Sequence, residues 1–372
     1  MRILFVSTHT DPLAPPINGD GQRTCLLYQA CLRVAQVDVV TFAGQRGKPA
    51  VKSRFEKWRD AFLRKDIASL FSVIPKWESI VDAKIREGNY DFIVARYFYR
   101  AASCGLLKHR EKLIVDFDDD LPFYFLNQIT EKSSFSHRVR MRVAARRAAH
   151  DGPKIVRTLR AAFFAEESVA KRNQGVFLPN IPYYSTSCAD VEMVTPTKRI
   201  IFVGQLEYLP NKEGVEHFLE SIYLPLIKKV PDVELHLVGR VTNDRLRQKW
   251  QEYPHVTVTG FVKDLAQEYA DSHVVAVPIY RCGATNIKLL EAMQMNRACV
   301  TTKEVYERMN GRFENRQDLY VASSDDEFVE ALVTLLGNEE ENRRIAHHAK
   351  ETMNRYFSFE SFSEIVKNAI LQ

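Results

Sequence analysis

Residues 277–295 read Val-Pro-Ile-Tyr-Arg-Cys-Gly-Ala-Thr-Asn-Ile-Lys-Leu-Leu-Glu-Ala-Met-Gln-Met. This stretch predicts the end of a strand, a tight loop and then a helix. The apolar run before Tyr280 is typical of a buried strand, Gly283 permits a sharp turn, and Thr285 or Asn286 can cap a helix. A strand that passes through a short loop into a helix is the repeating unit of an α/β fold.

The beginning of this helix suits a phosphate group, because the first backbone N–H groups of a helix are free and its dipole is positive there. Lys288 lies in the first turn, where it opposes the dipole unless an anion is bound. Glu291 lies on the same face of the helix and could accept hydrogen bonds from a diol such as a ribose. An ordinary amphipathic helix with a solvated Lys–Glu pair is the alternative, and these residues alone leave both open.

The chain of 372 residues is too long for one ordinary core, which predicts two domains. Its hydrophobic fraction of 45% and charged fraction of 27% are typical of a soluble globular protein. The formal net charge of +5 is mild for this length, so we expect no nucleic-acid partner. The cysteines include no CxxC pair, which indicates a reduced, cytoplasmic protein. We expect no signal peptide and no membrane-spanning helix.

Strands and helices alternate along the N-terminal half, which predicts a parallel sheet with ligands at the carboxyl ends of its strands. We expect strands at Ile3–Ser7, Val37–Phe42, Phe92–Ala95, Leu113–Val115 and Gly175–Pro179, and a helix at Gln22–Val34. A loop containing Gly19 and Gly21 precedes that helix, with Arg23 in its first turn. The loop could hold a sugar or phosphate near its backbone, and a plain surface turn is the alternative. It does not match G-x-G-x-x-G, so a dinucleotide site is not supported.

The C-terminal half repeats the alternation. We expect strands at Arg199–Val203, Val233–Val238, Val256–Thr259, Val274–Ile279 and Cys299–Thr302, and helices at Val215–Lys229 and within Asp325–Gln372. Gly204, Gly239 and Gly260 each follow a strand, and their shared position favours a ligand site over glycines that merely end strands. The predicted domains are 1–182, 199–350 and a terminal helix, 351–372, packing back on the first domain. A polar linker at 183–198 joins the two main domains.

Three charged segments have open interpretations. Carboxylates cluster at Asp116–Asp120, which could form a sugar-hydroxyl site, a helix cap or, least favoured, a metal site. Five arginines and no acid occur in Ser136–Arg147, which suits an anionic acceptor, an anionic lipid surface or acidic partners, with a solvated helix as the alternative. Basic and aromatic residues alternate in Arg54–Lys65, where we favour a packed amphipathic helix over contact with a membrane.

Four sequence motifs of the C-terminal half occur in the same order in a known family. They are Phe202-Val-Gly204, Pro231-Asp-Val-Glu-Leu-His-Leu-Val-Gly239, Val256-Thr-Val-Thr-Gly-Phe-Val262 and Lys288-Leu-Leu-Glu-Ala-Met293. The chain resembles the family 4 retaining glycosyltransferases of the GT-B type, strongly over Arg199–Thr302 and more weakly before it. The resemblance implies two Rossmann-like domains whose parallel sheets face a cleft.

The resemblance also implies an activity: transfer of a sugar from a nucleotide diphosphate donor, with retention, to a glycan, lipid-linked or protein acceptor. Bacterial surface polysaccharide synthesis is one such setting. The donor would lie in the C-terminal domain, and the acceptor on the side of the N-terminal one. No tightly bound cofactor and no metal are expected. We expect a cytoplasmic protein that associates peripherally with the inner face of the membrane.

Site residues follow from the resemblance by position. Glu291 would bind the ribose, Arg240 and Val262 would flank the base, and Gly19 and Gly204 would lie near the ligand. The diphosphate would be held by the backbone N–H groups of Ala284, Thr285 and Asn286, with Lys288 beside them. Lys212 would replace a missing arginine, because Gln205 follows Gly204. Asp118 or Asp119 would orient the donor sugar or acceptor, and we place Asp118, Lys288 and Glu291 in the catalytic set.

One departure concerns Gly283, which stands where the family has an acid that touches the donor sugar. This departure and Gln205 motivate an alternative: a nucleotide-sugar-binding protein of the same fold without transferase activity. An epimerase or phosphorylase on this fold is a third hypothesis. The sequence contains no recognisable Ser-His-Asp set, and none is required if the departing phosphate oxygen takes the acceptor proton.

Overall fold

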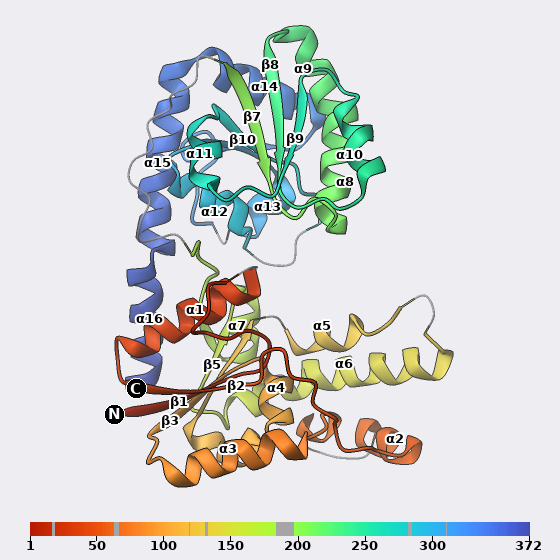
Figure 1. The fold of residues 1–372 in the computed structure, drawn as a ribbon, viewed down its shortest axis with the longest axis vertical. Helices are drawn as coiled ribbons and strands as arrows, with labels where there is room; N and C mark the ends of the chain where they lie inside the picture. Colours follow the sequence, from red (N-terminus) through yellow and green to blue (C-terminus); the bar gives the residue numbers. More distant parts are fainter. Residues whose placement is uncertain are drawn as a thin grey trace. The chain divides into compact units, whose positions relative to one another are not determined.

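The computed structural model describes residues 1–16, 19–62, 67–118, 120–130, 133–183, 197–281, 285–309 and 311–372. The chain forms two compact units (Figure 1). The first comprises Met1–Pro179 and Glu360–Gln372, and the second comprises Asn180–Phe359. Each unit contains a six-stranded sheet in which every described strand pairing is parallel. The α/β class with two Rossmann-like sheets is therefore confirmed.

The sheet of the first unit has the strand order β2-β1-β3-β4-β5-β6. The strands are β1 (Arg2–Ser7), β2 (Gln36–Thr41), β3 (Phe92–Arg96), β4 (Leu113–Asp118), β5 (Ala161–Phe164) and β6 (Val176–Phe177). The helices are α1 (Gly19–Leu32), α2 (Arg54–Phe62), η1 (Ile67–Leu70), α3 (Pro75–Glu87), α4 (Phe98–Ser103), η2 (Leu106–Lys112), α5 (Leu121–Leu126), α6 (Phe135–Val156), α7 (Glu167–Asn173) and, at the end of the chain, α16 (Phe359–Leu371).

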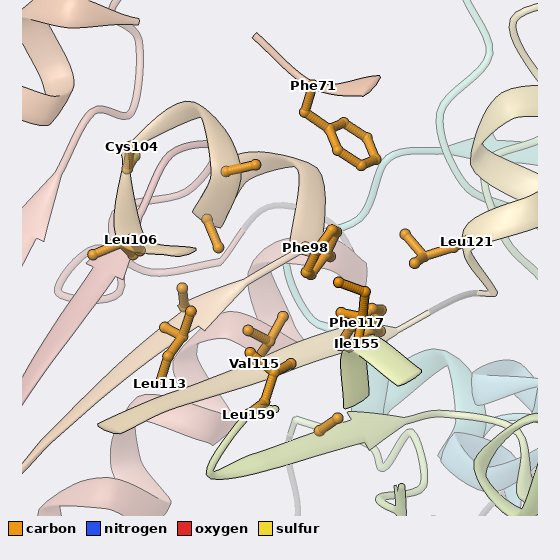
Figure 2. Packing of buried hydrophobic residues seen from close by; sticks show 14 of the residues in the cluster. Phe71, Phe98, Cys104, Leu106, Leu113, Val115, Phe117, Leu121, Ile155 and Leu159 are labelled. Atoms are coloured by element: carbon orange, nitrogen blue, oxygen red, sulfur yellow. The ribbon is translucent and has the colours of Figure 1, made fainter. Parts of the chain in front are cut away.

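Aromatic side chains fill the core on one side of this sheet. The ring of Phe98, from α4, stacks on that of Phe117, from β4, with 5.2 Å between the ring centroids. Phe71 meets Phe98 edge to face, and Figure 2 shows these rings together with Val115 and Leu121. The central strands are buried on both faces, which explains why they read as continuous apolar runs.

The sheet of the second unit has the strand order β12-β11-β10-β7-β8-β9. The strands are β7 (Lys198–Val203), β8 (Val233–Val238), β9 (Val256–Gly260), β10 (Val274–Val277), β11 (Ala298–Thr302) and β12 (Tyr320–Ala322). The helices are α8 (Leu209–His217), the π-helical segment η3 (Phe218–Tyr223), α9 (Leu224–Lys229), α10 (Asp244–Gln251), α11 (Leu265–Ala270), α12 (Ile287–Gln294), α13 (Lys303–Glu307), α14 (Asp325–Gly337) and α15 (Glu339–Phe357).

Each sheet has a point where the strand order reverses, and such points form ligand-binding crevices in open α/β sheets. In the second unit the reversal lies between β7 and β10, which are adjacent in the sheet although two strands separate them in sequence. In the first unit it lies between β1 and β3. The candidate site residues gather at the carboxyl ends of these strands.

Several expected elements differ from those observed. The glycines of the 19–21 segment form the first turn of α1 rather than a loop ahead of it. The helix expected from Val215 begins at Leu209, which places Lys212 inside α8. Strands β5 and β12 were not predicted, because four and three residues are too few to show a clear period. None of the described helices is long and apolar enough to cross a membrane.

Candidate functional site

The backbone packs closely where β7, β8 and β10 end in the second unit. A Cβ atom on Gly239, whose φ is +141°, would lie 1.7 Å from the carbonyl oxygen of Gly204. A Cβ atom on Gly214, in α8, would lie 2.1 Å from the carbonyl oxygen of Pro278. Neither position has room for a side chain, so these glycines allow the strand ends and α8 to converge.

Helix α12 begins directly after the strand-end loop of β10. The side chain of Asn286 caps it by accepting a hydrogen bond from the backbone N–H of Lys288 at 3.2 Å. That cap uses one of the free N–H groups at the helix start and leaves the others available to a ligand. Thr285 is buried beside the cap, and among the described residues its hydroxyl oxygen has no hydrogen-bond partner.

The side chain of Lys288 extends from α12 across to the end of β7. A Cβ atom placed on Gly204 would lie 2.6 Å from Cε of Lys288, so the absence of a side chain at residue 204 makes room for the lysine. The side chain of Lys288 therefore extends across the point between β10 and β7 where the strand order reverses. This contact explains in steric terms why a glycine follows β7.

Glu291 lies one turn further along α12 and is only 9% exposed. Burial raises the pKa of its carboxyl to about 7, although the charge of Lys288 opposes the shift. Burial in turn lowers the pKa of the Lys288 ammonium, and Glu291 partly offsets that effect. Two charged groups thus stand together in a poorly solvated place, which is typical of a functional site.

The remaining predicted donor residues surround this point less tightly. Arg240 follows β8 and is exposed, while Val262 follows β9 and is half-buried. Lys212 is half-buried in α8. Gly283 and Ala284 lie outside the described residues. The structure therefore brings Gly204, Thr285, Asn286, Lys288 and Glu291 together around the ends of β7 and β10, and places Arg240 and Val262 along the same edge.

Three further residues at this edge were not predicted as site residues. Asn211 is buried, and its amide donates a 2.7 Å hydrogen bond to the carbonyl oxygen of Gln205. Phe261 has a ring that is 80% exposed, next to Val262. Tyr269 is fully buried near Glu291, and in the described part of the chain its hydroxyl is unpaired. Of the three, only Asn211 could have been identified from the sequence, because it belongs to the segment Tyr208-Leu-Pro-Asn that follows Gly204.

Two arginines occupy the carboxyl edge of the first unit's sheet. The guanidinium of Arg23, from α1, pairs with both carboxylate oxygens of Asp116 at 2.7 and 2.8 Å. It also donates to the carbonyl oxygen of Leu178 at 3.0 Å. Arg96, at the end of β3, lies 3.0 Å from the same carboxylate. Burial would raise the pKa of Asp116, but the charges of Arg23 and Arg96 outweigh it and leave the pKa below its usual range.

Asp118 lies two residues beyond Asp116 at the end of β4. Its φ is +62°, and the pairing with β5 shifts register there. Its carboxylate receives a 2.6 Å hydrogen bond from Arg96 and is partly exposed. Tyr97 also has a positive φ, and its hydroxyl donates to Asp20 at 2.6 Å. These non-glycine residues in the left-handed region mark a strained strand end, which is common at functional sites.

The carboxylates of the acidic cluster at Asp116–Asp120 that the structure describes have arginine partners. Asp116 and Asp118 are neutralised by Arg23 and Arg96, and Asp120 pairs with Arg172. Arg23 is 3% exposed, so its first-turn position serves an internal ion pair rather than an open ligand site. Asp119 is not among the described residues. Within those ranges no group of three or more histidine, cysteine, aspartate and glutamate side chains is arranged to hold a metal ion.

Gly19 is the other predicted site residue of the first unit. It is the first residue of α1 and is exposed, and Asp20 beside it accepts the hydrogen bond from Tyr97. Asp118 and Gly19 belong to the first unit, whereas the α12 residues belong to the second. Each group therefore forms a separate strand-end cluster.

Comparisons with known proteins relate part of the chain to glycosyltransferases by sequence, and almost the whole chain by fold. Residues 197–338 match the family model described as Glycosyl transferases group 1. This domain contains β7, α8 and α12, and it indicates a glycosyltransferase. A search of curated protein sequences gave no match.

Solved structures of similar fold cover almost the whole chain. Sucrose-phosphate synthase from Thermosynechococcus elongatus matches 98% of this chain and 96% of its own, with a TM-score of 0.64 and 15% identity. HepE of Anabaena, solved in complex with UDP, matches 100% of both chains, with a TM-score of 0.65 and 15% identity. WaaG, a glycosyltransferase involved in lipopolysaccharide biosynthesis, covers 100% of this chain and 99% of its own, with a TM-score of 0.59 and 15% identity. The fold is that of the GT-B glycosyltransferases.

Proposed function

We propose that the protein is a retaining glycosyltransferase, of the family 4 type, that binds a nucleoside diphosphate sugar at the carboxyl ends of β7 and β10. The observation that supports this most directly is the direction of the Lys288 side chain. It extends from the first turn of α12 to the backbone of Gly204 at the strand-order reversal. A cation and a helix N-terminus then lie together at the strand-order reversal, an arrangement that suits a diphosphate.

The proposed chemistry concerns the negative charge that grows on the diphosphate as the sugar departs. Lys288 and the backbone N–H groups of Thr285 and Asn286 would stabilise that charge. Gly283 and Ala284, outside the described residues, are proposed as further donor-binding residues. Preorganised donors of this kind usually provide the largest part of catalysis. Glu291 would accept hydrogen bonds from the ribose, and Arg240 and Val262 would flank the base. Lys212, from α8, would add a second positive charge.

The proposed nucleotide and acceptor follow from the solved structures of similar fold. The HepE complex contains UDP, so a uridine nucleotide is the first candidate for the donor. Asp118 would orient the donor sugar or acceptor with the part of its carboxylate that Arg96 leaves exposed, and Gly19 would lie near the same ligand. A glycan, lipid-linked or protein acceptor fits this arrangement, and WaaG supports a surface-glycan pathway by analogy only.

A thermal-shift panel of UDP, GDP, CDP and ADP with their common sugars tests the donor site. We expect one nucleotide to raise the melting temperature of the wild-type protein, because a ligand that binds only the folded state stabilises it. Glu291→Ala should reduce that shift, measured against the variant's own melting temperature. Glu220→Ala removes an exposed glutamate of the same unit and should leave the shift unchanged. No shift with any nucleotide at millimolar concentration would rule out the donor site.

A nucleotide-sugar-binding protein without transferase activity is the second candidate, because Gly283 replaces an acid and Gln205 replaces an arginine of the family pattern. Labelled nucleotide sugars separate the two. Transfer or slow hydrolysis that depends on Glu291 supports the enzyme. Binding that saturates without any turnover over the full panel supports the binding protein.

We also propose peripheral association with the cytoplasmic face of an anionic membrane. Arg142 and Arg146 of α6 are exposed, and no carboxylate of the described chain pairs with either of them. Phe55 on α2 and Phe135 at the start of α6 are exposed by 74% and 82%. We expect co-sedimentation with anionic vesicles that weakens as salt rises, since exposed charges are screened. Equal binding to neutral vesicles would contradict this electrostatic attachment.

A further inference from the structure

Two adjoining cavities in the first unit are lined by residues of α2, η1, α5 and the N-terminal half of α6, far along the chain from the donor residues. Figure 1 labels α2, α5 and α6. Their volumes are about 170 and 460 Å³. Lys57 of α2 and Arg140 of α6 line both cavities, so the two adjoin, and together we call them the α2–α6 hollow. Helices α2 and η1 both pack against α6, which fixes the walls.

The charges of this hollow are unbalanced. Asp60 is the one carboxylate among its described lining residues, and it already pairs with Lys52 at 2.8 Å. Within the described chain, the ammonium of Lys57 has no hydrogen bond or ion pair. Arg140 donates only to Nδ1 of His137 at 3.1 Å, and Nε2 of that ring lies 3.1 Å from the carbonyl oxygen of Gln128. Neither of these groups is a carboxylate, so among the described residues Lys57 and Arg140 have no carboxylate partner.

The first turn of α6 adds to the positive potential. Ser134 caps the helix by accepting a hydrogen bond from the backbone N–H of His137, and Ser134 and Ser136 both line the larger cavity. The first turn contains no acidic residue, so nothing on the helix itself offsets its dipole. Ser69 lines the smaller cavity, and its buried hydroxyl is unpaired in the described structure. Cations, hydroxyl donors and a helix N-terminus together favour an anion with several oxygens.

One aromatic ring contributes an apolar surface to the larger cavity. The indole of Trp58 lines it and stacks on Phe62, with ring centroids 4.8 Å apart. A ligand that places an anion between Lys57 and Arg140 can therefore lay an apolar part against the Trp58 indole.

We propose that the α2–α6 hollow is a binding site for a phosphate monoester, with Lys57 and Arg140 as the anion-binding pair. The phosphate can belong to a lipid headgroup or to a soluble phosphate ester, since both present the same oxygens. This site is independent of the donor site on the second unit, and its test does not involve nucleotide or turnover.

The fluorescence of Trp58 provides a direct readout. Trp77 and Trp250 are buried at 3% and 0% exposure, so Trp58 is the tryptophan that a ligand in the hollow would affect. The full-length protein is titrated with inorganic phosphate, glycerol phosphate and a short-chain phosphatidic acid below its micelle concentration. Phosphatidylcholine of the same chain length is the lipid control. Trp58→Phe should abolish the signal and so confirms its origin.

Paired variants distinguish a defined site from a diffuse positive surface. Lys57→Ala with Arg140→Ala removes the two cations of the hollow and should weaken phosphate binding by about tenfold or more, because charge-assisted hydrogen bonds are lost. Lys76→Ala with Arg86→Ala removes the same charge from exposed positions of α3, outside the hollow, and should leave binding nearly unchanged. Lys57→Ala alone, which alters an exposed side chain, keeps the test valid if the double variant folds poorly.

The outcomes are distinct. Saturable binding that only the first pair of substitutions weakens supports the site, and tighter binding of phosphatidic acid than of soluble phosphates identifies a lipid as the source. Comparable binding of the soluble esters identifies a soluble ligand. Equal weakening by both pairs, binding of phosphatidylcholine as tight as that of phosphatidic acid, or no saturable signal with any phosphate would overturn the proposal.

Discussion

At the scale of single residues, Glu291 is a carboxyl group held where ionisation is costly. Its folded-state pKa of about 7 exceeds its ordinary value of 4.5. Below the ordinary value both states are protonated and nothing is lost. As pH rises toward 7 the unfolded chain ionises first, so the folded state loses stability, and the full cost applies above 7.

Glu291→Gln should therefore raise stability relative to wild type at pH 8 and have little effect at pH 4. The shift in pKa, which already includes the attraction to Lys288, corresponds to up to about 3 kcal/mol. Thermal melts at the two pH values measure it. Glu220→Gln, on an exposed glutamate, should show no such pH-dependent difference, and a Glu291→Gln curve parallel to wild type would contradict the buried ionisation.

The glycines of the strand ends give a second prediction at this scale. Gly239→Ala forces a Cβ atom to within 1.7 Å of the Gly204 carbonyl oxygen at a positive φ, and should cost several kcal/mol or prevent folding. Gly337→Ala is the matched control, because no heavy atom lies within 4 Å of its added Cβ. Alanine favours a helix over glycine, so the control should be neutral or stabilising. Urea unfolding compares the two, and similar losses would contradict the close approach of the strand ends.

At the scale of elements, one carboxylate joins α1, β3 and β4. Asp116 has no solvent-exposed surface and forms ion pairs with both Arg23 and Arg96. Asp116→Asn leaves two buried guanidinium groups short of a counter-charge and should cost about 3–5 kcal/mol. Asp232→Asn breaks an exposed pair with Lys198 and should have little effect on stability, because exposed ion pairs are screened by solvent.

The stabilisation by the Asp116 ion pairs depends on pH with the opposite sign from the effect of Glu291. The folded-state pKa of Asp116 is lowered, so its contribution is complete above its ordinary value of 3.8 and is lost as the pH falls through the lower folded value. Denaturant unfolding of wild type and Asp116→Asn should therefore converge only in strong acid. A difference that vanishes already near neutral pH would contradict the ion pairing.

At the scale of the whole molecule, the end of the chain returns to the first unit. Phe362, Val366 and Ile370 of α16 are buried, and Arg160 donates to the carbonyl oxygen of Ile370 at 3.1 Å. Deleting 360–372 should lower the melting temperature of the first unit while sparing the second, because buried apolar contacts are removed only there. Calorimetry should resolve two transitions in the deletion variant, with nucleotide raising only that of the second unit. A single transition that nucleotide raises as a whole would contradict independent behaviour of the units.

The sequence by itself determined the alternation of strands and helices, the parallel sheets and the residues around the start of α12. Those features depend on local periodicity, glycine placement and helix-capping chemistry, which neighbouring residues reveal. It also indicated that Lys288 and Glu291 share a face of one helix. The short strands β5 and β12 escaped prediction because their pairing is supplied by distant strands.

Only the tertiary structure decided how charges are partnered. Asp116 meets an arginine 93 residues away, so the acidic run could not be separated from a metal or sugar site in advance. The reach of Lys288 to Gly204 and the unbalanced cations of the α2–α6 hollow depend likewise on elements far apart in sequence. Burial and pairing are properties of the folded environment, and they determine both the pKa of a side chain and its availability to a ligand.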